Sequence, residues 1–276
     1  MLPFDHAVIS VMDDLDGAAA LYSRLGFTLT PRGHHTVGSI NHTMVFSGNY
    51  LELLGYAPGE REKRAEMWAY PRGLTGLAVR TANAAELYGE MRAAGIPLEE
   101  LKHISRPVEI DGASAHAHVR ASTFQIDRRE TGNGRIFVCQ HDTPELIWRK
   151  GFDNHANGVT GIAAATMIAD DPAHLLGLLS SVPGLERGND SVACAGSTTL
   201  RVMTPQTASR ALGVGEDLPG LAGKPMRMVA LDLDCPSLER VATLLSGNGV
   251  PFRRGEGCVL VAPDAAGGLI LRFVAA

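Results

Sequence analysis

The chain has 276 residues, of which 45% are hydrophobic and 20% are charged, and its formal net charge is −5. This length predicts one large domain or two small ones, and the mildly negative charge argues against a broad surface for nucleic acid or acidic membranes. No apolar run approaches the roughly 20 residues that a membrane span needs, and the first residues lack the order of a signal peptide. We therefore expect a cytoplasmic protein that binds neither nucleic acid nor membrane.

The four cysteines lie far apart and form no C-x-x-C pair, which argues against a zinc knuckle or a dithiol redox site. Three of them stand in apolar, strand-like surroundings. We expect buried thiols, as in a reducing compartment. The residues are Cys139, Cys194, Cys235 and Cys258.

One pattern of strand, amphipathic helix and glycine occurs four times along the chain. In each copy, alternating or β-branched apolar residues give way to a 3.6-residue period, and a glycine follows where the helix should end. Asp16, Asn83 and Asp171 stand near helix starts, where side-chain caps are favoured. The predicted strands and helices are 6–11 and 14–25, 76–81 and 83–94, 161–166 and 170–182, and 228–234 and 236–248.

Each helix is followed by further strand-like runs, and the last run of each copy is predicted at 50–55, 144–149, 199–204 and 270–275. A βαβββ unit of about 50 to 75 residues is too small to bury both faces of its sheet, so such units should pair. The sequence therefore predicts an α+β fold of four modules, paired into two curved mixed-sheet domains over 1–150 and 158–276. The modules are 1–57, 73–150, 158–212 and 226–276, and the polar segment 149–158 is the expected linker.

The tandem modules and their motifs resemble a known group of proteins. The first strand reads FDHAVISV (4–11), the run 31–55 ends in YLELLG, and 140–152 reads QHDTPELIWRKGF. These stretches resemble the vicinal oxygen chelate superfamily of lactoylglutathione lyase, extradiol dioxygenases and antibiotic-resistance proteins, and more narrowly its glyoxalase-like branch. The resemblance extends over nearly the whole chain by layout, and it is specific in 4–55 and 135–152.

The resemblance implies a divalent metal inside the cupped sheet of the first pair. His6 falls on the first-strand ligand position, and Glu52 and Glu145 fall on the last-strand positions of the first and second modules. The fourth position, usually histidine, falls at Gly76, or at Thr75 if the register differs by one. One imidazole and two carboxylates suit Mn²⁺, Fe²⁺, Zn²⁺ or Ni²⁺ and leave open positions for a chelating substrate. A carboxylate that the metal does not need, Glu52 or Glu145, would be the catalytic proton carrier.

Other histidines could line the same cup. His116 and His118 share one face of a predicted strand, because strand side chains alternate with a period of two, and one of them could supply a further nitrogen. Substrate contacts are also expected from Asn41 and His42, together with His34 and His35, and from His141 near Glu145. Trp148 is expected either to pack in the core or to form a platform for the substrate.

A simpler interpretation is open for each candidate ligand. His6 could be a core histidine hydrogen-bonded beside Asp5, Glu52 could be an exposed edge residue, and Glu145 could cap a turn after Pro144. A buried carboxylate at 52 would need a partner or a ligand to offset its desolvation.

The second pair has arginines where the first has the two carboxylates. Arg201 and Arg272 stand at the corresponding places of their last strands, and guanidinium groups cannot ligate a cation. We expect no metal there. The second pair either binds an anion or is a scaffold with solvated or carboxylate-paired arginines.

Two classes of function fit these observations. One is a metal-dependent lyase or isomerase of glyoxalase type that acts on a small substrate with adjacent oxygens. The other is a metal-free protein of the same fold that binds or sequesters a small molecule, and the missing histidine at Gly76 favours it. An extradiol dioxygenase with Fe²⁺ is a further alternative that needs a second histidine ligand. Modules of this kind also pair between chains, so a homodimer is an open alternative.

Overall fold

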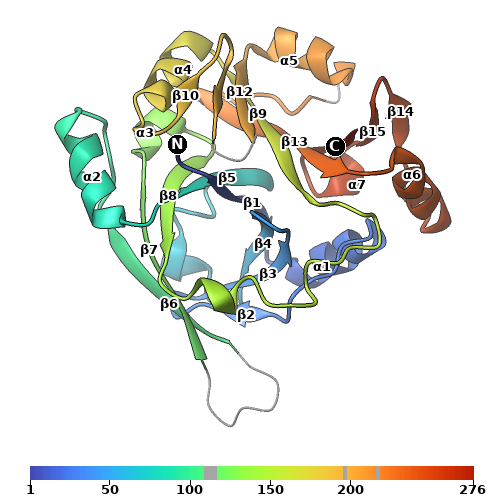
Figure 1. Ribbon diagram of the computed structural model, residues 1–276, viewed down its shortest axis with the longest axis horizontal. Helices are drawn as coiled ribbons and strands as arrows, with labels where there is room; N and C mark the ends of the chain where they lie inside the picture. Colours follow the sequence, from blue (N-terminus) through green and yellow to red (C-terminus); the bar gives the residue numbers. More distant parts are fainter. Residues whose placement is uncertain (109–116, 195–197, 216–217) are drawn as a thin grey trace.

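The strand, helix and three-strand unit recurs four times in the computed structural model, which describes residues 1–108, 117–194, 198–215 and 218–276 (Figure 1). The first module has β1 Phe4–Met12, α1 Leu15–Arg24, β2 Gly33–His34, β3 Ser39–Val45 and β4 Tyr50–Tyr56. The second has β5 Gly73–Arg80, α2 Ala84–Ala93, β6 Lys102–Val108, β7 Ala117–Gln125, α3 Arg128–Thr131 and β8 Arg135–His141.

The second half repeats this order with shorter outer strands. Its first module has β9 Gly161–Ala169, α4 Pro172–Ser180, β10 Glu186–Arg187, β11 Ser191–Ala193 and β12 Thr199–Met203. Its second module has β13 Met226–Cys235, α6 Leu238–Gly247, β14 Arg253–Gly255, β15 Cys258–Val261, α7 Pro263–Ala266 and β16 Ile270–Ala275. The connecting helices are η1 Arg61–Arg64, η2 Pro144–Leu146 and α5 Pro205–Leu212.

The modules pair into two eight-stranded sheets of the same topology. The strand orders are β2-β3-β4-β1-β5-β8-β7-β6 and β10-β11-β12-β9-β13-β16-β15-β14. In each sheet the first strands of the two modules run antiparallel at the centre, and each last strand runs parallel to the first strand of its own module. The predicted α+β fold with two curved mixed sheets is confirmed. In Figure 1 the blue-to-green first pair lies below and to the left of the yellow-to-red second pair.

Helix caps follow the expected chemistry with one shift. Asn83 and Asp171 accept hydrogen bonds from the backbone amides of Glu86 and His174 at the starts of α2 and α4. The first helix is capped by Asp14, not by Asp16 as predicted. Asp16 lies in the first turn, where its charge suits the positive end of the helix.

The predicted last strand of the second module is wrong. Residues 144–146 form the short helix η2, and the strand that pairs with β5 is β8, Arg135–His141. Pro144 has no amide hydrogen to donate to a ladder and is favoured at a helix start, so the chain leaves the sheet before it. The other three last strands are confirmed.

The inner faces of the two sheets are filled differently by the segments that connect their modules. In the second pair, Ala208 and Leu212 of α5 pack in one apolar cluster with Ile168, Ala230 and Ile270 of the central strands. In the first pair, the corresponding connection places Met67 and Trp68 against Val8, Ala78 and Phe137. The rest of that inner face, around His6 and Glu52, lines a cavity.

Residues of the predicted linker are buried between the two pairs. The backbone amide of Thr28 donates to His155 Nδ1 at 3.0 Å, and His155 Nε2 donates to the carbonyl of Val45 at 3.0 Å. Burial lowers the pKa of His155 and keeps its ring neutral. Asn157, also buried, donates to the carbonyl of Leu25 at 3.0 Å. The segment that leads into the second pair is therefore hydrogen-bonded to the first pair.

All four cysteines are free and buried, as expected. Within the described ranges, the structure contains no helix with the length and apolar character required to cross a membrane.

Gly73 and Gly268 hold a close backbone contact between the pairs, and we expect Gly73→Ala to destabilise the protein by roughly 2–4 kcal/mol. Gly73 has a φ of 115°, and a Cβ built on it lies 2.5 Å from the carbonyl oxygen of Gly268. Urea unfolding measures the change. The control is Gly89→Ala inside α2, where an added Cβ meets nothing within 4 Å and should stabilise by about 0.5–1 kcal/mol. Equal urea midpoints for Gly73→Ala and Gly89→Ala would contradict the close contact between Gly73 and Gly268.

Candidate functional site

A cavity of about 110 Å³ lies inside the curved sheet of the first pair. Its polar lining includes His6 and Glu52 from the central strands, Asn41 from β3, and Arg106 and Arg135 from the second module. Apolar walls come from side chains that share the same inner face: Leu54, Val119, Ala121, Phe137 and Ile147. The edge strands β2 and β6 approach each other beside the cavity, where Thr36 Oγ1 donates to the carbonyl of Ser105 at 3.2 Å.

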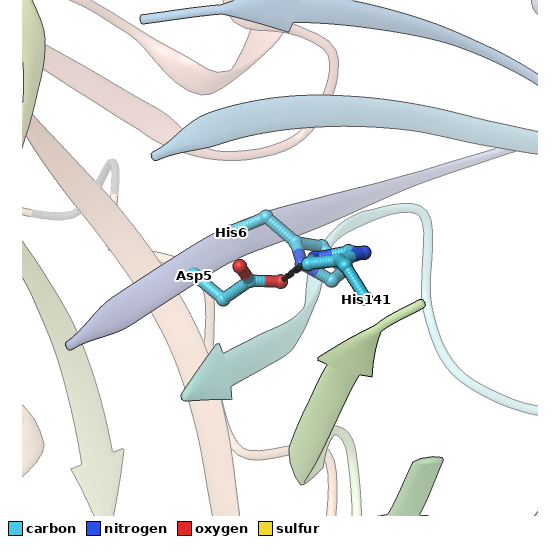
Figure 2. A group of neighbouring side chains, drawn as sticks. All are labelled: Asp5, His6 and His141. Carbon is cyan, nitrogen blue, oxygen red and sulfur yellow. Dashed lines mark hydrogen bonds and ion pairs between the residues drawn. The ribbon is translucent and has the colours of Figure 1, made fainter. Parts of the chain in front are cut away.

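Two imidazoles share one buried carboxylate at the wall of this cavity. Figure 2 shows His6 and His141 approaching the same oxygen of Asp5, with His6 Nδ1 2.7 Å and His141 Nε2 2.8 Å from Oδ2. Because an ionised carboxylate only accepts hydrogen bonds, these two ring nitrogens carry the protons in the neutral rings. His6 Nε2 is then unprotonated. His141 Nδ1 is likewise bare, and it is buried without a hydrogen-bond partner.

The ionised state of Asp5 is stabilised by its partners. Burial favours the neutral acid, but hydrogen bonds from His141 and His6 outweigh it and hold the pKa of Asp5 below its usual range. Arg80 adds a positive charge 3.6 Å from the other oxygen, Oδ1. A register shift between Phe4 and His6 in the β1–β5 ladder leaves Asp5 out of the pairing. This bulge explains how Asp5 contacts its neighbour His6, because bulges re-aim side chains.

His6 is held in place by aromatic rings as well as by Asp5. Its ring stacks on Tyr50 with centroids 4.3 Å apart, and it packs edge-to-face with Phe137 with centroids 5.2 Å apart. Burial raises the pKa of Tyr50 well above its ordinary value, so its phenol keeps its proton and remains a donor.

Glu52 is a buried carboxylate oriented by an amide. Asn41 Nδ2 donates to Glu52 Oε1 at 2.6 Å, and Glu52 Oε2 lies 3.9 Å from His6 Nε2. Thr43 lies beside Glu52 in the β3–β4 register and also lines the cavity. The bare nitrogen of His6 and one oxygen of Glu52 therefore border the same small volume.

The four-ligand metal pattern implied by the resemblance is half present. His6 pairs with Tyr50 and Val8 with Glu52, whereas Gly76 pairs with Arg135 and Ala78 with Phe137. With Gly76 matched to His6, the residue matched to Glu52 is Phe137, which has no ligand atom. A Cβ at Gly76 would lie 2.9 Å from the Cβ of Val8, so a longer side chain does not fit there without movement.

A different trio brings metal-binding atoms together. One ligand atom each from Asp5, His6 and His141 lie within 4.8 Å of one another. The ring nitrogens that face Asp5 are its hydrogen-bond donors, and a metal between them would have to displace both protons. Within the described ranges, the donor atoms therefore form a hydrogen-bonded centre and do not complete the metal site expected from the resemblance.

Three predicted site residues lie away from the cavity, and one lies outside the described residues. Glu145 is exposed on η2, because the strand ends before Pro144. His42 alternates with Asn41 and Thr43 along β3, and its Nδ1 donates to the carbonyl oxygen of Thr30 at 2.7 Å. His118 is exposed, with Nδ1 3.1 Å from Ser105 Oγ. The prediction for His116 falls outside the described residues.

Of the other predicted site residues, some line the cavity and others lie outside it. Asn41, His141 and His35 line the cavity, and His34 is exposed. Trp148 packs with its indole Nε1 donating to the carbonyl of Phe46 at 3.1 Å, and Arg80 lies 5.0 Å above its ring.

In the second pair the two arginines bind one carboxylate. Arg201 Nη1 lies 2.7 Å from Asp232 Oδ2, and Arg272 Nη1 lies 3.2 Å from Asp232 Oδ1. The strand registers place Ala164 and Ala230 where the first pair has His6. This arrangement agrees with arginines paired to a carboxylate in a scaffold.

Sequence reasoning missed the two arginines and Tyr50 as cavity residues. Arg106 lies on β6 and Arg135 begins β8, strands whose register could not be read from periodicity. Tyr50 was visible, because it precedes Glu52 by two residues and so shares its face.

Comparison with known proteins gives a family and a fold. A family model of the glyoxalase-like domain matches residues 4–182. A search of curated proteins gives no match. A hypothetical protein from Staphylococcus aureus has a similar structure, with a TM-score of 0.69 over 100% of both chains at 13% identity.

Two further solved structures are similar. A mutant of 4-hydroxymandelate synthase from Streptomyces coelicolor has a TM-score of 0.58 at 10% identity, over 100% of this chain and 93% of that chain. A xylose isomerase-like TIM barrel/4-hydroxyphenylpyruvate dioxygenase fusion protein has a TM-score of 0.58 at 11% identity, over 99% of this chain and 49% of that chain. At such identities the likeness concerns the fold alone.

Proposed function

Because this chain belongs to the family of glyoxalase-like domain proteins, we propose that its first module pair is a lyase or isomerase that moves a proton on a small oxygenated compound. The observation that carries the proposal is the Asp5–His6 pair, whose unprotonated Nε2 faces the cavity beside Glu52. A protein that only sequesters a ligand needs no oriented base, so this pair favours the enzyme over the binding protein.

The chain's own residues supply the parts of a proton transfer. His6 Nε2 would take a proton from a carbon next to a carbonyl, and Asp5 would stabilise the resulting imidazolium. The Tyr50 phenol, still protonated, can donate to an oxygen where negative charge develops. Glu52, held by Asn41, is placed to pass a proton at a neighbouring atom of the same compound.

We propose that this chemistry is independent of a metal. Gly76 and Phe137 occupy two of the four ligand positions, and Glu145 is outside the cavity. In the pattern implied by the resemblance, the second imidazole of a dioxygenase iron site would stand at Gly76, which has no side chain, and the imidazoles of His6 and His141 are instead hydrogen-bonded to Asp5. The expected Mn²⁺, Ni²⁺, Zn²⁺ or Fe²⁺ is therefore given no step in the proposed reaction.

Hydrogen exchange in D₂O tests the proposed proton transfer. Glycolaldehyde, hydroxyacetone and pyruvate each carry acidic hydrogens next to a carbonyl, and loss of their proton NMR signals reports exchange. We expect the protein to accelerate exchange for at least one of these three probes. The control is Glu145→Gln, an exposed position that should leave the rate unchanged. Exchange equal to that of the solution without protein, for all three, would contradict the proposal.

Removal of metals tests whether the proposed proton transfer is independent of a metal. We expect EDTA treatment to leave the exchange rate unchanged, and metal analysis of protein purified without chelator to find no stoichiometric ion. Stoichiometric metal that disappears in His6→Ala, together with exchange that is lost on chelation and restored by that metal, would overturn the metal-independent mechanism.

A further inference from the structure

Two guanidinium groups in the cavity wall have no hydrogen-bond or ion-pair partner among the residues that the structure describes. Arg106 and Arg135 make no hydrogen bond or ion pair with any residue that the structure describes, and Arg135 Nε is buried without an acceptor. Arg135 has only the face of Phe137, 4.9 Å from its guanidinium carbon. Both arginines are half-buried. Charges that are partly removed from water are normally paired, because an unpaired buried charge is costly.

The neighbouring carboxylates do not fill this role. Glu99, near Arg135, is held by Arg128 through two hydrogen bonds of 2.8 and 3.1 Å. Glu52 acts on both arginines only through its charge. Its Oε1 accepts from Asn41, and its Oε2 lies 3.9 Å from His6 Nε2. Burial lowers the pKa of both guanidinium groups, yet values that start so high leave them charged at neutral pH.

The two guanidinium groups border the volume in which His6 and Glu52 meet. Arg135 lies in the same row across the sheet as Glu52, because Glu52 pairs with Val8, Val8 with Gly76, and Gly76 with Arg135. Arg106 comes from the opposite edge strand. Its Nη1 is 2.8 Å from a Cβ built on Gly33, whose β3 partner is Asn41. An anion in the cavity can therefore reach a guanidinium group while its neighbouring atoms face His6.

We infer that the cavity binds a small carboxylic acid as its monoanion, with Arg106 and Arg135 as the groups that recognise the carboxylate. Two guanidinium groups against one carboxylate leave one uncompensated positive charge among the lining side chains, which matches a monoanion better than a phosphate dianion. Hydrogen-bond acceptors and donors on Asn41, Thr43 and Tyr50 suit a second oxygen beside the carboxylate. Carboxylate binding presupposes the proposed function in one respect only, that the same cavity holds the substrate.

Binding of matched probes tests the carboxylate specificity without any turnover. Lactate and lactamide have the same size and the same 2-hydroxyl group, and they differ in charge. We expect lactate to bind the wild-type protein at least about tenfold more tightly than lactamide, measured by NMR titration, since hydrogen bonds to a charged group contribute about 1.5–3 kcal/mol. Inorganic phosphate should bind more weakly than lactate. Equal affinity for lactate and lactamide, no saturable lactate binding, or tighter phosphate binding would overturn the inference.

Variants assign the effect to the two arginines. Arg106→Gln and Arg135→Gln should each weaken lactate binding about tenfold and leave lactamide binding unchanged. The control is Arg254→Gln, an exposed arginine on β14 of the second pair that bonds to Glu239. Lactate affinity that stays at the wild-type value in both cavity variants would overturn the inference.

Thermal unfolding separates recognition from a structural role. Because neither guanidinium has a hydrogen-bond or ion-pair partner in the described part of the chain, each Arg→Gln change should leave the melting temperature without ligand unchanged or higher. A marked fall in both variants would show that these arginines are structural and would contradict the inference.

The His6→Gln variant distinguishes the two proposals. It should keep the preference for lactate over lactamide while losing exchange. Lactate discrimination without any exchange in the wild type would sink the proton-transfer function and leave the carboxylate site standing. Proton exchange by a wild-type protein that binds lactate and lactamide equally would support the proton-transfer function and overturn the carboxylate site.

Discussion

We expect His6→Gln to lower the rate of proton exchange by about 10²–10⁴-fold, the range that one positioned general base contributes. His6 is the residue whose bare Nε2 faces the cavity, and Asp5 fixes which nitrogen is bare. A glutamine amide has comparable polarity but no basic nitrogen, so it removes the proton acceptor while it can still donate to Asp5. The exchange rate measured by NMR in D₂O, at saturating probe, is the readout.

Two controls make this result specific to the base. A retained preference for lactate over lactamide in His6→Gln would show that the cavity is intact, and Glu145→Gln should exchange at the wild-type rate. A His6→Gln protein that folds, binds lactate and exchanges at the wild-type rate would eliminate His6 as the base and with it the proposed mechanism.

We expect Asp5→Asn to have the second large effect, a loss of about 3–5 kcal/mol of stability, as when one partner of a buried charged group is removed. The carboxylate of Asp5 accepts from two imidazoles and lies 3.6 Å from Arg80. Asparagine has one acceptor oxygen and no charge, and its amide group must share the site with two ring nitrogens. Exchange should also fall, because His6 loses the group that fixes its tautomer and stabilises its protonated form.

The pH dependence of the stability difference between the wild type and Asp5→Asn tests whether Asp5 is ionised. Its pKa in the folded protein lies below its unfolded value, so its stabilising contribution is full above the unfolded value near pH 4 and is lost as pH falls through the folded one. Urea unfolding should therefore show a large gap between wild type and Asp5→Asn from neutral pH to about pH 5. The gap should narrow only in stronger acid. A gap that disappears between about pH 7 and pH 5 would contradict an ionised Asp5.

Much of the fold was predictable because it depends on short-range patterns. The four helices follow from apolar spacing and capping residues such as Asn83, and three of the last strands follow from alternation. The same period of two put His6 on one face of β1 and Glu52 on one face of β4, where the structure has them lining the cavity. The predicted strand over 144–149 was wrong because Pro144 begins a short helix and the apolar run 135–141 forms the last strand.

The sequence by itself therefore determined the repeated modules, their pairing, and the absence of a ligand side chain at Gly76. Only the tertiary structure decided what surrounds His6. The bulge at Asp5 overrides the alternation that would separate neighbouring side chains, and the β5–β8 register brings Phe137 to the place of a ligand. The approach of β2 to β6 brings Arg106 to the cavity from residues distant in sequence. Ladder register and sheet closure are set by long-range pairing, which local periodicity does not encode.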